Sequence, residues 1–186
     1  MRPARARRAL GASLAALARA AARRPARGGL GGVISGAGSP LIEHARPAME
    51  AIDAWLVRGG ATIPPRARAL IGLGPGLTPS GDDYLAGLMI GLRATGNRSA
   101  AAALWKWLEP QAATLTSAIS GTHLAAAARG EVHAALHACV DALLGARAAR
   151  GDVRWKFLLA RLDAVGHCSG RDGLAGVVAV ARHRPG

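Results

Sequence analysis

The chain has 186 residues, a formal net charge of +13 and an apolar content of 51%. This length fits one domain, and with one Phe and one Tyr its core must consist largely of Ala, Leu and Val. No stretch approaches the roughly 18 consecutive apolar residues of a membrane span. Two cysteines are too few for a disulfide framework, so we expect a cytoplasmic protein.

The first 28 residues form an Arg-rich segment. Eight arginines precede the first acidic residue, Glu43, and taking these eight charges from +13 leaves +5. Leu10, Leu14 and Leu17 share one helical face, which predicts an amphipathic helix or tail that docks on a partner subunit. No aromatic-studded basic strand or recognition helix accompanies the charge, so the sequence does not favour nucleic acid as a partner.

The periodicity of apolar residues predicts helices along the whole chain. They cover 4–24, 41–58, 64–70, 80–95, 98–108, 110–128, 131–147, 152–165 and 170–182, with Gly, Pro or Asn at most breaks. The only strand candidates are GGVIS at 31–35 and VVAVA near the end. We therefore predict a mainly α fold, with the Arg-rich segment 1–28 preceding a single helical domain over 29–186.

The most informative stretch is GLGPGLTPSGDDYLAG, residues 72–87, which contains five glycines, two prolines and two adjacent carboxylates. Its first half predicts a loop, and its second half a helix start capped by Thr78 or Ser80. No Lys lies nearby, and the glycines run G-x-G-x-G, so neither a P-loop nor a dinucleotide-binding fingerprint is present.

The second half of this stretch is repeated. The pattern S-G-x-D-x-L-A-G occurs at 80–87 and again at 169–176, with six of eight positions identical. Each copy places a Ser and a first-turn Asp at the start of a Gly-bearing helix, so we expect the helical domain to pack around the two loop-helix motifs and the two helix starts to face one pocket. His167 precedes the second copy and adds an imidazole.

These motifs supply the candidate site. The carboxylates suit hydrogen bonds from a substrate N–H or a divalent ion at Asp82 and Asp83; the alternative is that they only cap helices. A helical stripe at positions 133, 137 and 141 is better explained as a solvated edge than as a metal site, so no resident cofactor is expected. Our catalytic candidates are Asp82, Asp83, His167 and Asp172, and our substrate-binding candidates are Gly74, Gly76, Thr78, Ser80, Gly81, Ser169 and Gly170.

Three blocks of this chain resemble a known family. The blocks are GLGPGLTPSGDDYLAGLMIGL (72–92), TSAISGTHLAAAARGEVHAAL (116–136) and GHCSGRDGLAGVV (166–178). They are similar to the signature blocks of a family, long filed as a domain of unknown function, that includes the third subunit of the oxamate carbamoyltransferase of allantoin breakdown. Members tend to carry a further N-terminal region, so we expect a short version that lacks part of it.

The resemblance implies a subunit of a hetero-oligomeric enzyme that moves a carbamoyl group between phosphate and oxamate. Its partners would be other subunits and a small-molecule substrate. Two other functions stay open on the residues alone: a noncatalytic helical scaffold, and a metal-assisted amide hydrolase. Whether this chain itself catalyses a reaction is left undecided by the sequence.

Overall fold

The computed structural model describes residues 3–59, 62–145 and 151–183, and these form eight α-helices, two 3₁₀ helices and no strand. The mainly α, single-domain prediction is confirmed. None of the described helices is both long enough and apolar enough to cross a membrane. The elements are α1 (Pro3–Arg23), η1 (Gly31–Ile34), α2 (Pro40–Arg58), η2 (Pro65–Leu70), α3 (Ser80–Ala94), α4 (Arg98–Leu115), α5 (Ala118–Arg129), α6 (Ala134–Leu144), α7 (Asp152–Leu162) and α8 (Ser169–Arg182).

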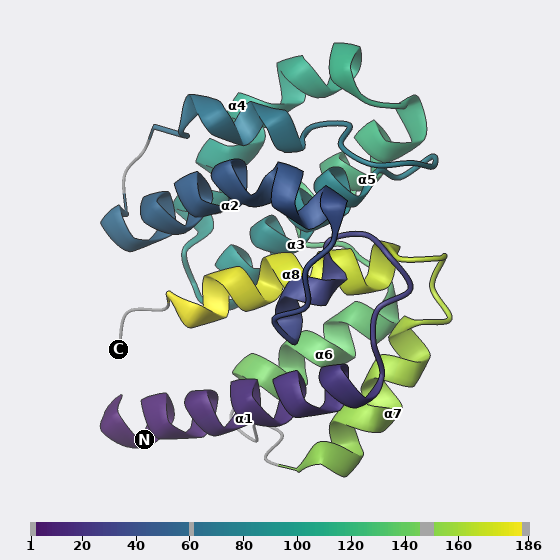
Figure 1. Cartoon of the computed structure of the whole chain (residues 1–186). Helices are drawn as coiled ribbons and strands as arrows, with labels where there is room; N and C mark the ends of the chain where they lie inside the picture. The colour runs from purple at the N-terminus through teal and green to yellow at the C-terminus, as the bar shows by residue number, and fades with distance from the viewer. Residues whose placement is uncertain (1–2, 60–61, 146–150, 184–186) are drawn as a thin grey trace.

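Helices α3 and α8 form the centre of the fold. Figure 1 shows α8 in the middle of the molecule, with α2 and α4 on one side and α1, α6 and α7 on the other. Every residue of α8 from Gly170 to Ala181 is buried. The pair packs backbone to backbone, because a Cβ at Gly87 would collide with the carbonyl of Gly173, and one at Gly176 with the carbonyl of Tyr84. Glycines inside these two helices therefore set how closely they approach.

The Arg-rich segment forms helix α1, which packs within its own chain. Its predicted apolar face meets α6 and α7, where Leu17 is buried and Leu10 and Leu14 are partly buried against the core. Arg23 adds an ion pair to Asp152 on α7 at 2.5 Å. The face that we expected to dock on a partner subunit is thus covered by the chain itself.

Several predicted boundaries are wrong, among them the end of the helix predicted at 152–165, which stops at Leu162. A break at residue 109 was expected, but α4 runs through Pro110 to Leu115. Pro110 has no N–H for the Lys106 carbonyl, yet the helix continues. The Gln111 side-chain amide adds a hydrogen bond to the following carbonyl, that of Trp107, at 2.7 Å. The next helix begins at Ala118 and not at 110. The helix predicted to start at 131 begins at Ala134, because His133 caps it. The end of that prediction, 146–147, lies outside the described residues.

Both strand candidates are also wrong. The first, GGVIS, forms η1, and VVAVA lies within α8. An apolar run without alternation fits either a buried strand or a helix buried on all sides, and α8 is the second of these.

Candidate functional site

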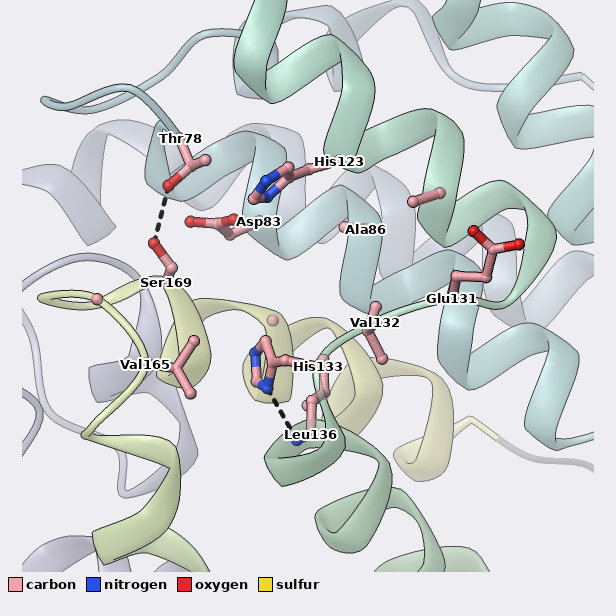
Figure 2. Close-up of a pocket in the computed structure, with 13 residues that line it drawn as sticks. Thr78, Asp83, Ala86, His123, Glu131, Val132, His133, Leu136, Val165 and Ser169 are labelled. Carbon is pink, nitrogen blue, oxygen red and sulfur yellow. Dashed lines mark hydrogen bonds between the residues drawn. The ribbon is translucent and has the colours of Figure 1, made fainter.

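A pocket of about 510 Å³ lies beside the first turns of α3 and α8. Thr78 and Asp83 come from the first motif and Ser169 from the second, while His123 of α5 and His133 at the start of α6 supply the imidazoles of the lining (Figure 2). The apolar part of the wall includes Ala86, Ala126, Val132, Leu136 and Val165. The pocket therefore combines two carboxylates, those of Asp83 and Glu131, with two hydroxyls and two imidazoles in a largely apolar lining.

Two acidic residues, Asp83 and Glu131, belong to the pocket lining. Glu131 forms an ion pair with Arg129, whereas the Oδ2 atom of Asp83 is buried and has no hydrogen-bond partner among the described residues. Burial raises the pKa of Asp83 to about 7, the hydroxyls of Ser169 and Thr78 oppose this rise, and the charges of Asp172 and Asp82 add to it. A carboxyl with this pKa exchanges its proton near neutral pH, which suits acid–base work.

Hydroxyl groups connect the two motifs at the N-termini of α3 and α8. Thr78 Oγ1 and Ser169 Oγ lie 2.9 Å apart, and this contact is drawn in Figure 2. Deeper in the fold, Ser80 Oγ lies 3.7 Å from Cys168 Sγ. The starts of α3 and α8 are therefore adjacent, and the polar groups between them come from both copies of the repeat.

Asp82 points away from the pocket and is buried. Its Oδ1 accepts the N–H of Gly72 at 2.9 Å, and its Oδ2 accepts the hydroxyls of Thr116 and, at 2.7 Å, Ser120. Both oxygens are engaged by protein donors, which tie the Gly72 loop to the start of α5. The carboxylate thus holds the loop that leads into α3.

Asp172 is also buried and contacts a different segment. Its Oδ1 accepts the backbone N–H groups of Leu30 and Gly31 at 2.7 and 2.8 Å. Gly29, at φ +69°, lies so close to the carboxylate that a side chain there would collide with it. Burial raises the pKa of Asp172, and the Ser80 and Cys168 side chains and the two N–H groups oppose that rise.

The remaining predicted residues lie outside the pocket lining. Gly74 and Gly76 turn the loop at φ values of +107° and +98°. Gly81 and Gly170 occupy equivalent places, each pressed against a carbonyl of an earlier segment, Leu70 and Leu162 respectively. His167 is exposed. Of the eleven residues we singled out, the pocket lining contains Thr78, Asp83 and Ser169.

Sequence reasoning did not assign His123 and His133 to the pocket. The Nδ1 of His133 accepts the Leu136 N–H at 3.2 Å, so in the neutral ring Nε2 carries the proton and acts as a donor. Burial lowers the pKa of His133, and the neighbouring His137 and His123 lower it further. Both pocket imidazoles lie in the block at 116–136 that resembles the family. That resemblance was the feature of the sequence that could have assigned them to the site.

The groups that could bind a metal ion or act as a thiol nucleophile lie apart or are protonated. In the part of the chain that the structure describes, no three His, Cys, Asp or Glu side chains gather to hold a metal ion. His137 and Asp141 are exposed on α6, whereas His133 caps that helix. Burial, followed by the charge of Asp172, raises the pKa of the Cys168 thiol to about 11, so this sulfur is protonated at neutral pH.

Comparison with protein families places the chain in one family. The family model described as oxamate carbamoyltransferase subunit AllH matches residues 70–181, more than half of the chain. This chain belongs to the AllH family. The AllH match begins at Leu70 and ends at Ala181 of α8. The Leu70 carbonyl packs on Gly81 of the first motif. The matched range contains every residue of the pocket lining. Neither a curated protein nor a solved structure matches the chain.

Proposed function

We propose that this chain supplies a substrate pocket to an oxamate carbamoyltransferase, within an assembly with other subunits. The observation that carries the proposal is the pocket carboxylate of Asp83, whose buried Oδ2 has no hydrogen-bond partner in the part of the chain that the structure describes. Buried polar atoms are normally hydrogen-bonded, and one left without a partner in a pocket is suited to a ligand. The match to the AllH family supports carbamoyl transfer as the reaction.

The reaction needs a proton transfer that Asp83 is suited to provide. In phosphate-dependent cleavage of oxalurate, a phosphate oxygen bonds to the carbamoyl carbon and the bond from that carbon to the oxamate nitrogen breaks. The proton of the attacking phosphate ends on the departing nitrogen, giving oxamate and carbamoyl phosphate. An amide nitrogen leaves poorly without a proton, and an acid with a pKa of about 7 can relay one at neutral pH.

The other polar groups suit the carbamoyl oxygen and the reaction's charge. The Nε2–H of His133 and the hydroxyls of Thr78 and Ser169 are donors for a carbonyl oxygen that gains charge during attack. The lining contains no Lys or Arg, so we propose that the cationic groups for phosphate come from another subunit. This division of groups makes catalysis a property of the assembly.

The test is activity of the assembly. The chain is co-expressed with the proteins encoded beside it, the complex is purified, and phosphate-dependent cleavage of oxalurate is followed as carbamoyl phosphate formation. Asp83→Asn is expected to lower turnover by about 100-fold with assembly intact, because a positioned polar group is lost. Asp141→Asn, an exposed carboxylate on α6, serves as the matched control and keeps full turnover.

Two results would overturn the proposal. One is an assembly that forms but does not form carbamoyl phosphate, which would favour the noncatalytic scaffold. The other is an Asp83→Asn assembly as active as the wild type, which would place the reaction elsewhere in the complex.

A further inference from the structure

The two copies of the repeat are related by an approximate two-fold axis. Positions 84 and 87 of the first copy correspond to 173 and 176 of the second. Gly87 packs on the carbonyl of Gly173, and Gly176 packs on the carbonyl of Tyr84, so the contacts are reciprocal. Further along, Gly91 meets Val180, its own counterpart, as expected for a position beside the axis. Helices α3 and α8 therefore run side by side in the same direction.

This symmetry extends to the polar groups at the helix starts. Asp83 and Asp172 are counterparts, as are Ser80 and Ser169. The Ser169 hydroxyl lowers the pKa of Asp83, and the Ser80 hydroxyl lowers the pKa of Asp172. Each carboxyl therefore interacts with the serine of the other copy. The fold thus contains two carboxylates in matching surroundings.

The two carboxylates differ in what covers them. The chain itself closes the Asp172 copy, where the consecutive N–H groups of Leu30 and Gly31 meet one oxygen at 2.7 and 2.8 Å. Among the described residues no such segment covers the Asp83 copy, which opens into the pocket of about 510 Å³. The Oδ2 atoms of both carboxylates are buried without a hydrogen-bond partner in this part of the chain, but only that of Asp83 belongs to a residue of the pocket lining. The closed copy shows which ligand chemistry a carboxylate in these surroundings accepts, namely amide N–H donors.

Building on the proposed function, we propose that Asp83 is a specificity-determining residue that binds the N–H groups of a primary amide or ureido substrate, as Asp172 binds backbone amides. The opposite wall supplies the complementary group, because the Nε2–H of His133 is a donor for the carbonyl oxygen of the same amide. A ketone of the same shape offers the oxygen but has no N–H for the carboxylate. The pocket is therefore expected to distinguish amides from isosteric ketones.

The test is binding to the purified full-length chain by calorimetry, with two probes. Oxamate carries an NH₂ group where pyruvate carries a methyl group, and the two molecules are otherwise alike. Above the pKa of Asp83, wild-type chain is expected to bind oxamate roughly tenfold or more tightly than pyruvate, the usual effect of a hydrogen bond to a charged acceptor. Asp83→Asn loses this preference, and Asp141→Asn retains it.

Equal affinity for oxamate and pyruvate, or no binding of oxamate, would overturn the inference. If Asp83→Asn does not fold, N,N-dimethyloxamate replaces the variant, and it should bind no better than pyruvate because it lacks N–H groups. The inference and the proposed function fail separately. An active assembly whose chain shows no oxamate preference refutes only the inference, and an oxamate preference without carbamoyl transfer refutes only the proposed function.

Discussion

Asp83→Asn should change how the stability of the chain depends on pH. Burial raises the pKa of Asp83 from 3.8 to about 7 in the folded chain. Between these two values the folded chain keeps a proton that the unfolded chain has released. The free energy of unfolding therefore falls as pH rises through this window and levels off above about pH 7. Asparagine does not titrate, so the variant lacks this loss.

The size of the effect follows from the two pKa values. At about 1.4 kcal/mol per pKa unit, the difference between 3.8 and about 7 corresponds to roughly 4 kcal/mol. Asp83 is half-buried, so part of its charge is solvated and we expect about 2 to 4 kcal/mol. The variant should match the wild type near about pH 4 and exceed it by this amount at about pH 8.

Urea denaturation at several pH values measures this difference. The quantity of interest is the variant's free energy of unfolding minus that of the wild type, in which the titrations shared by both proteins cancel. Asp141→Asn removes an exposed carboxylate and controls for the loss of a charge. A difference between Asp83→Asn and the wild type that is the same at about pH 4 and about pH 8 would refute the buried, unpartnered state of Asp83.

Three further predictions concern the surroundings of the pocket. Asp172→Ala leaves two buried N–H groups without an acceptor and should cost about 2 to 4 kcal/mol, measured as a fall in Tm of about 5 to 15 °C; an unchanged Tm would contradict it. Gly87→Ala forces a methyl group against the Gly173 carbonyl and should lower the free energy of unfolding, measured in urea, by about 2 kcal/mol or more. Gly121→Ala on α5 meets open space and should raise that free energy by about 0.5 to 1 kcal/mol. Equal effects of the two substitutions would contradict the close packing of α3 on α8. Cys168 should react with iodoacetamide at about pH 8 roughly 100-fold more slowly than an unperturbed thiol, followed by mass spectrometry, and rapid labelling would show that its pKa is not raised.

The sequence predicted the elements and the adjacency of the motifs better than the roles of individual carboxylates. The helix periodicity is a local feature and predicted most of the helices, and the repeated S-G-x-D pattern predicted the starts of α3 and α8. The partners of each carboxylate are not local. Asp82 is engaged by hydroxyls of Thr116 and Ser120, more than thirty residues away, and Asp172 by the backbone at Leu30. Periodicity carries no information about such contacts.

The same limit applies to the pocket's far wall. His123 belongs to α5 and His133 caps α6, and only the packing of these helices against α3 brings their side chains opposite Asp83. In sequence, His133 was better explained as part of a solvated stripe with residues 137 and 141. The structure separates the three, because a capping residue at the start of a helix does not follow the helical face.

The one charge reversal between the two copies explains how a symmetric helix pair supports unequal sites. Asp82 corresponds to Arg171, and each of these buried residues fixes the segment that leads into its own helix. Asp82 holds the Gly72 loop, while Arg171 pairs with Asp163 at 2.5 Å and donates to the Arg24 carbonyl. Arg171 thereby anchors the end of α1, and the chain that follows α1 runs directly over Asp172. Among the described residues no equivalent contact brings a segment over Asp83, which lines the pocket where we propose that a ligand binds.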